Sequence, residues 1–302
     1  MRIAVTGATG TIGRALVRGL QERGDEVTVL TRDAKRAQER LPGVEAVEWD
    51  DPKELAAPAW ALSGRDGVVH LLGETVAQRW TEHARKEIRD SRVFGTRNLV
   101  EGIRAAEVPP RVLVSQSGSG YYGARGDERV DESGAAGDDF LARVVVGWEE
   151  QALRAQELGL RVVLTRTGVV LSEGGGALEK MLPFFKLGVG GPVAGGRQYV
   201  PWIHLDDIVG AILFALDDDR LSGPVNVSAP APATNRELSK ALGRVLHRPA
   251  IAPVPAAAVK ALYGEMASIV TTGVRMVPAK LEQLGYGFSQ PDLESALRAA
   301  TA

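Results

Sequence analysis

The chain has 302 residues, of which 44% are hydrophobic and 25% charged, so it can build a substantial core. Its formal net charge of -2 gives no sign of polyanion binding, which argues against a nucleic-acid partner. It has no cysteine, which excludes disulfides and thiolate chemistry, and its four histidines lack metal-ligand spacing. The N-terminus shows no signal peptide, and no apolar run approaches the ~18 residues of a membrane span. We therefore expect a cytoplasmic protein without metal, membrane or nucleic-acid sites, either monomeric or homodimeric.

The first two-thirds of the chain alternate short apolar runs with helical patterns. The runs are rich in valine and leucine, which is typical of parallel strands buried on both faces. We predict strands at 2–7, 26–32, 45–50, 67–73, 111–117 and 161–171. Helical patterns cover 11–24, 82–107 and 138–158. This alternation predicts an α/β fold with a doubly wound parallel sheet.

After about residue 172 the pattern changes to glycine-rich loops and then to helices broken by proline and glycine. Thr234 and Glu237 have the spacing of a capping box at the start of one helix. We assign 1–172 to a sheet domain, with 198–228 returning to it. Residues 173–302 form a smaller, mainly helical substrate lobe.

A glycine motif follows the first predicted strand. In VTGATGTIG, three glycines (Gly7, Gly10 and Gly13) have GxxGxxG spacing and lead into a helix. Glycines let the backbone approach a pyrophosphate, and the free N–H groups of a helix start favour its charge. The motif predicts a dinucleotide site in a Rossmann-type fold. The alternative is a glycine turn needed only for close packing of strand and helix.

The end of the second predicted strand indicates which dinucleotide would bind. An acidic residue there accepts hydrogen bonds from the ribose of NAD. Here Arg32 comes first and Asp33 follows, and a guanidinium can pair with a 2′-phosphate through two parallel hydrogen bonds. The sequence therefore favours NADP. NAD is the alternative if Asp33 contacts the ribose. A further alternative is that these charged residues only form a solvated cluster and bind no ligand.

Three motifs together resemble the extended short-chain dehydrogenase/reductase superfamily, which includes nucleotide-sugar epimerases and dehydratases. They are TGATGTIG, SGSGYYG and WIHLDDIV. The longer stretches 73–92 and 175–207 resemble an atypical "epimerase family" branch with a C-terminal helical domain of unassigned function. The resemblance covers essentially the whole chain. It implies a nicotinamide-dinucleotide fold with a small substrate lobe.

The resemblance also implies roles for single positions. Thr11 and Ile12 join the three glycines in the pyrophosphate loop, and Asp50 matches a residue that contacts adenine, although a strand-terminating turn is the alternative. Other cofactor positions lie at the ends of later strands: Leu71, Leu72, Gly73, Ser115, Gly168 and Val170. Arg197 matches a position that often meets an anionic substrate group.

Most of the superfamily's catalytic groups are missing. Its usual set is Asn, Ser, Tyr and Lys, in which the tyrosine transfers a proton. If Glu149 is the glutamate that follows the lysine by four residues, the tyrosine and lysine positions hold Leu141 and Val145. The asparagine position holds Arg92. Only the serine is left, and the helix 138–158 reads as a packing element with Trp148 in its apolar stripe.

Other residues are candidates for the missing proton chemistry. Glu74 follows the fourth predicted strand, where a carboxylate could act as acid or base. Ser117 and Tyr122 follow the fifth strand, and all three would face the nicotinamide at the carboxyl ends of the strands. His204 reads better as a buried brace of its turn, and Asp206 and Asp207 as the acidic start of a helix.

Three functions are consistent with these features. The first is an NADP(H)-dependent oxidoreductase of atypical type acting on a small carbonyl, alcohol or activated alkene. The second is a non-catalytic scaffold that responds to NADP(H). The third, a nucleotide-sugar epimerase, needs the base that Leu141 and Val145 do not provide.

Overall fold

The computed structural model of the chain describes residues 1–301. Its centre is a seven-stranded sheet with the order β11-β7-β5-β4-β1-β2-β3, in which every neighbouring pair is parallel. The strands are β1 (Arg2–Thr6), β2 (Glu26–Thr31), β3 (Glu45–Glu48), β4 (Gly67–His70), β5 (Val112–Gly118), β7 (Arg161–Thr167) and β11 (Gly223–Val227). The prediction of a doubly wound parallel sheet is confirmed.

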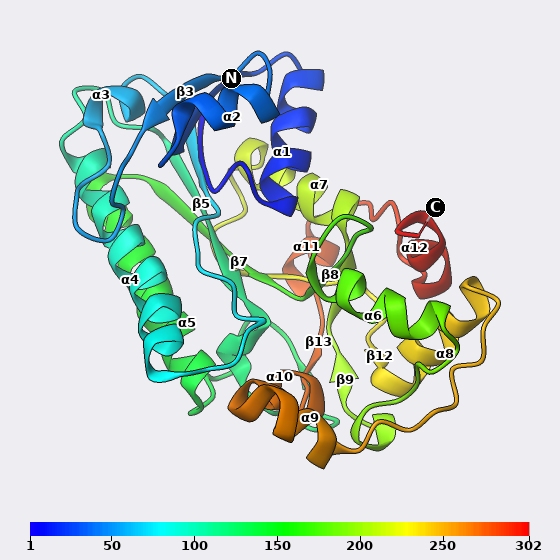
Figure 1. Ribbon diagram of the computed structural model, residues 1–302. Coiled ribbons are helices and arrows are strands. Elements are labelled where there is room, and N and C mark those ends of the chain that lie inside the picture. Colours follow the sequence, from blue (N-terminus) through cyan, green and yellow to red (C-terminus); the bar gives the residue numbers. More distant parts are fainter. Residues whose placement is uncertain (302) are drawn as a thin grey trace.

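Helices cover both faces of this sheet (Figure 1). Side chains alternate along each strand, so Val112 and Val114 join the core under α1 (Thr11–Glu22) and α7 (Leu205–Asp217). Leu113 faces the opposite way, toward α4 (Glu82–Arg104) and α5 (Phe140–Leu153). Short helices α2 (Ala34–Arg40) and α3 (Ala59–Leu62) and the 3-10 turns η1 (Ser119–Tyr122) and η2 (Arg154–Leu158) complete this part.

The predicted strand 161–171 is wrong as a single element. It is two strands, because the chain leaves the sheet at Gly168 and continues as β8 (Val169–Leu171), which pairs with β10 (Trp202–His204). A Cβ at Gly168 would lie 2.1 Å from the carbonyl oxygen of Pro201, so only glycine fits this bend.

Most of the remaining elements belong to the C-terminal lobe, in which residues between Leu171 and Ala300 share an apolar core of their own to one side of the sheet (Figure 1). Thr234 and Glu237 form the predicted capping box at the start of α8 (Asn235–Val245). The helices are α6 (Gly176–Lys186), η3 (Ala194–Gly196), α8 (Asn235–Val245), α9 (Ala256–Tyr263), η4 (Gly264–Ala267), α10 (Ser268–Thr271), α11 (Ala279–Gln283) and α12 (Leu293–Ala299). The short strands are β6 (Arg129–Val130), β9 (Tyr199–Val200), β12 (Ala233–Thr234) and β13 (Arg275–Met276).

The domain division expected from sequence stays a prediction. The chain does return to the sheet through α7 and β11, after the excursion that contains α6. Across residues 1–301, no helix combines the length and apolar character that crossing a membrane requires.

Candidate functional site

The loop between β1 and α1 is shaped by two glycines. Gly7 has a φ of +67°, and a Cβ there would lie 2.6 Å from the carbonyl oxygen of Leu71. A Cβ at Gly13 would lie 2.4 Å from the carbonyl oxygen of Gly7. Gly10 caps α1 without a side-chain hydrogen bond, and the first turn carries no acidic residue. The loop therefore presents backbone groups rather than a capping or acidic side chain at a helix start, which suits an anionic group.

At the end of β2, Arg32 and Asp33 have different surroundings. The Asp33 carboxylate caps α2 by accepting a 2.9 Å hydrogen bond from the amide of Arg36. Arg32 is exposed, and its guanidinium takes part in none of the ion pairs of residues 1–301. The acid is thus engaged in holding its helix, whereas the guanidinium is free to meet a ligand.

Arg92, in the position of the usual asparagine, holds the loop after β4. Its Nη1 donates to the carbonyl oxygens of Glu74 (2.8 Å) and Ile88 (3.1 Å), and its guanidinium lies over the ring of Trp148. Burial lowers the pKa of Arg92 to about 10, against the opposing charge of Glu74. Arg92 therefore fixes the backbone beside Gly73, a role that the sequence did not suggest.

The other predicted cofactor residues lie in or directly after strands of the sheet and differ in exposure. Leu71 continues the β1–β4 pairing through its amide, which donates to Thr6, and Leu72 packs on the α4 side of the core. Ser115 is fully buried in β5, whereas Asp50 is exposed after β3. Gly168 and Val170 flank the bend into β8. Arg197 is exposed after η3.

Helix α6 spans this edge from the C-terminal lobe. At its start, a Cβ on Gly175 would lie 2.2 Å from the Thr11 hydroxyl, so the backbone of this loop rests directly on the phosphate loop. One turn further along, Lys180 Nζ donates a 2.6 Å hydrogen bond to the carbonyl oxygen of Ala77. The helix thus contacts both the loop after β1 and the loop after β4.

Ser117 belongs to a buried polar network. Its hydroxyl donates a 2.5 Å hydrogen bond to Glu149 on α5, and only 2% of the residue is exposed. Arg166 of β7 donates to both carboxylate oxygens of Glu149 at 2.8 Å. The Arg166 guanidinium also stacks on the Tyr121 ring, 3.4 Å from its centroid. This buried pair is fully satisfied, and it fixes the serine hydroxyl toward α5.

Tyr122 extends the same network away from the strand ends. Its hydroxyl donates a 2.6 Å hydrogen bond to Asn226 Oδ1 and accepts one from Arg166, and its side chain is fully buried. Burial raises the pKa of Tyr122 to about 12, although the charge of Arg166 opposes this rise. The expectation that Tyr122 points into the cofactor site is therefore wrong, because its hydroxyl and ring are enclosed by protein.

Glu74 is the most accessible of the three catalytic candidates. It is half-buried in the loop after β4, and one carboxylate oxygen accepts a 3.2 Å hydrogen bond from Gln78. Its amide donates to the hydroxyl of Ser91 on α4, and its carbonyl accepts from Arg92. The loop is therefore held at its backbone, while the carboxylate keeps an accessible side.

The usual tyrosine and lysine positions are packing positions here. Val145 is buried, and Leu141 is half-buried on the same face of α5. A Cβ at Gly120 would lie 3.4 Å from Cβ of Leu141 and 3.9 Å from Cγ2 of Val145, so the serine loop lies directly on both. Trp148 is 4% exposed, which confirms its predicted place in the core. His204 is buried and caps α7 by accepting from the amide of Asp206, as predicted.

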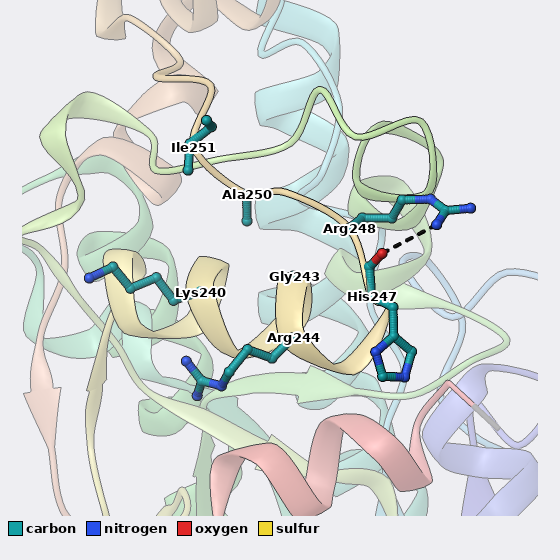
Figure 2. A pocket seen from close by; sticks show the side chains of 7 residues that line it. All are labelled: Lys240, Gly243, Arg244, His247, Arg248, Ala250 and Ile251. Carbon is teal, nitrogen blue, oxygen red and sulfur yellow. Dashed lines mark hydrogen bonds between the residues drawn. The ribbon is translucent and has the colours of Figure 1, made fainter.

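Two surface hollows lie elsewhere. The first, of about 470 Å³, is on the C-terminal lobe, where Lys240 and Arg244 project from α8 beside Arg248 (Figure 2). Arg244 pairs with Glu294, and Arg248 donates to the carbonyl oxygens of Lys186 and His247. Arg244 and Arg248 thus bind protein groups. The second hollow, of about 460 Å³, lies along the start of α4.

Comparison with known proteins identifies the family. The model of the NAD dependent epimerase/dehydratase family matches residues 3–228, and a domain of unknown function, DUF1731, matches residues 254–300. "Epimerase family protein SDR39U1 homolog, chloroplastic" from Arabidopsis thaliana is 40% identical over 99% of this chain and 86% of its own length. The human epimerase family protein SDR39U1 is 38% identical over the full length of both chains.

Solved structures agree with this. The crystal structure of human epimerase family protein SDR39U1 (isoform 2) with NADPH has a TM-score of 0.89 and 37% identity, and covers 100% of this chain and 99% of that one. A UDP-glucuronic acid 4-epimerase from Bacillus cereus, at 17% identity and a TM-score of 0.79, shares the fold. The resemblance inferred from the motifs is confirmed, and the chain belongs to the NAD dependent epimerase/dehydratase family.

Proposed function

We propose that this chain binds NADP(H) and is an atypical short-chain oxidoreductase acting on a small carbonyl, alcohol or activated alkene. The observation that carries the proposal is the glycine loop at the start of α1, in which a Cβ at Gly7 or Gly13 would collide with the backbone of Leu71 or Gly7, so that the loop keeps the tight turn of a phosphate-binding site. The human relative crystallised with NADPH supports the same cofactor. Arg32, with Asp33 engaged as a helix cap, is the group that would contact the 2′-phosphate.

The remaining cofactor contacts follow from the positions of the residues. Asp50 would meet the adenine, Leu71 to Gly73 the ribose, and Gly168 and Val170 the nicotinamide, with Ser115 beneath them. Arg197 would contact the substrate. When bound, the nicotinamide supplies or accepts the hydride, so the protein must position the reactants and handle one proton.

For the proton we favour Glu74, followed by Ser117. Glu74 has an accessible carboxylate on a loop that Arg92 holds in place. Ser117 donates its own proton to Glu149 and keeps an oxygen lone pair for a further donor. Leu141 and Val145 offer no base, which counts against transient oxidation of a sugar and therefore against epimerisation.

We propose a non-catalytic NADP(H)-responsive scaffold as the second candidate function. The observation in its favour is the buried network itself, because the hydroxyls of Ser117 and Tyr122 bind protein groups rather than facing solvent. Under this reading, α6 would report cofactor binding to a partner through its contacts with both loops. The cytoplasmic location and the monomeric or homodimeric state stay predictions under either function.

The experiment that tests the cofactor is a pair of glycine substitutions in one helix. Gly13→Ala places a Cβ against the backbone of Gly7 and should weaken NADPH binding by calorimetry at least about tenfold. Gly19→Ala is the control, because its Cβ would meet only side chains at 3.4 Å or more. Undiminished binding by the first variant would contradict the proposed site. Turnover on a carbonyl and enone panel then separates the oxidoreductase from the scaffold.

A further inference from the structure

Arg275, contributed by the C-terminal segment, has an unsatisfied guanidinium. Its Nε is buried and has no hydrogen-bond partner within residues 1–301. The same guanidinium joins none of the ion pairs of that part of the chain. Arg275 itself is half-buried, and Arg166 provides the contrast, since it is buried and binds both oxygens of Glu149. Buried donors without partners are rare in folded proteins, and one explanation is a ligand that completes them.

The surroundings of Arg275 are positive and aromatic. Its guanidinium lies over the Tyr199 ring, 5.2 Å from the centroid, which fixes its orientation. On the paired strand β6, Arg129 is its register partner, so two cations occupy neighbouring places on one face. Asp131, the acid two residues later, is engaged by the amide and hydroxyl of Ser133. An anion is the group that this arrangement lacks.

The position of Arg275 in the fold links it to the candidate site. Met276, the next residue, packs against Tyr122 in a small core, so Arg275 faces the other way, toward β9. Tyr199 in β9 precedes Pro201 by two residues, about 6–7 Å along a strand. The Pro201 carbonyl accepts a hydrogen bond from the amide of Val169, beside the segment expected to line the nicotinamide. Arg275 therefore lies where the C-terminal lobe meets the ends of the sheet strands.

We propose that Arg275 binds an anionic group, a carboxylate or a phosphate, of the molecule on which this protein acts. The proposal rests on the proposed function and names its substrate class. A planar guanidinium presents parallel N–H donors that match two oxygens of either group, and the Tyr199 ring holds it for that contact. The C-terminal segment thus supplies a specificity residue that the sheet domain alone does not have.

The test is binding of simple anions to the full chain saturated with NADPH, so that the phosphate loop is already filled. Inorganic phosphate and short mono- and dicarboxylates are titrated by thermal melting and calorimetry. The wild type should gain several degrees in melting temperature from the anion class that it binds. Whichever of phosphate and carboxylates gives the larger gain identifies the anionic group of the substrate. Arg275→Met should weaken that anion at least tenfold and leave the NADPH-induced shift unchanged. Arg18→Met, on the exposed side of α1, should behave as wild type.

A second readout separates a binding role from a structural one. Because the buried Nε has no partner, Arg275→Met should melt at or above the wild-type temperature without anion. Tyr199→Leu should also weaken the anion by freeing the guanidinium. Three results would each overturn the inference. The first is that the anion raises the melting temperature of Arg275→Met as much as that of the wild type, and the second is that it does not raise the melting temperature of the wild type at all. The third is a melting temperature of anion-free Arg275→Met below that of the wild type. Failure of the wild type to bind NADPH would contradict the proposed function instead.

Discussion

Lys180 Nζ and the Ala77 carbonyl oxygen are joined by a 2.6 Å hydrogen bond across 103 residues of sequence. Together with the contact between Gly175 and Thr11, this bond closes α6 over two loops of the candidate cofactor site. If the dinucleotide binds at these loops, we predict that α6 acts as a lid over it and that the two contacts set how readily the lid opens.

Lys180→Met should accelerate NADPH release about fivefold, since an exposed charge-assisted hydrogen bond contributes on the order of 1 kcal/mol. Stopped-flow fluorescence of NADPH release measures this rate. Lys186→Met is the matched control, because Lys186 is exposed on the same helix and its side chain binds no other residue among 1–301. Equal release rates in the two variants would show that the bond does not restrain the lid.

Substitution of Arg32 should affect the choice of cofactor, whereas substitution of Asp33 should affect stability. Arg32→Ala should weaken NADPH about tenfold or more while changing NADH little, because only NADPH carries the 2′-phosphate. Asp33→Ala should cost about 1 kcal/mol of stability through the lost cap, without reversing the preference. Fluorescence titrations with both reduced cofactors provide the measurement. Tighter NADH binding by the wild type would contradict the assignment of Arg32.

Substitutions of the three catalytic candidates should differ in their effects on kcat and on stability. If turnover is found, Glu74→Gln should lower kcat by ~10²–10⁴, the usual contribution of a general acid or base. Ser117→Ala should have a smaller effect, and Tyr122→Phe should leave kcat near wild type but destabilise the fold by ~1–3 kcal/mol, since Asn226 Oδ1 loses its donor. Steady-state kinetics and urea unfolding test this order. A tenfold loss in Tyr122→Phe alone would reverse it.

Tyr122 also predicts a loss of stability at high pH. Burial raises its pKa from 10.0 to about 12 in the folded chain, so the folded state binds the proton more tightly than the unfolded state. Its contribution is therefore complete below pH 10 and lost as the pH rises toward 12. Tyr286, whose pKa burial also raises, contributes in the same direction. Unfolding free energies of Tyr122→Phe should fall less steeply over this range than those of the wild type.

Restoring the usual tyrosine and lysine should not restore ordinary dehydrogenase chemistry. Leu141→Tyr would enlarge a packed position at a typical cost of ~1–3 kcal/mol, because the serine loop lies against it at Gly120. Val145→Lys would bury an ammonium group beside the same loop. Melting temperatures and turnover on the same substrate panel test the double variant. New activity in a stably folded double variant would show that the site tolerates these groups.

The sheet and the phosphate loop could be predicted because their signals are local. Valine-rich runs report burial on both faces, and the spacing of Gly7, Gly10 and Gly13 reports a close backbone approach. The strand break at Gly168 could not be predicted, because its cause is the carbonyl of Pro201, 33 residues later. The helix 138–158 was placed correctly, with a final 3-10 turn, because its apolar stripe is local as well.

The orientation of the polar side chains at and after the end of β5 could not be predicted. Ser117 and Tyr122 lie at the ends of the expected elements, yet Glu149, Arg166 and Asn226 determine where their hydroxyls point. One signal was present in the sequence, namely the charge of Arg166 within an otherwise apolar strand. A charge at such a place requires a buried partner, and α5 carries it.

The polar network also crosses the boundary between the two matched segments. Asn226, near the end of the first segment, donates to the carbonyl oxygen of Val277, while one oxygen of Glu132 accepts from the amides of both Asn226 and Lys280. Removing the second segment would leave these buried groups without partners. We therefore predict that the two matched segments form one cooperative unit, which melts in a single transition and resists division into independently folding halves.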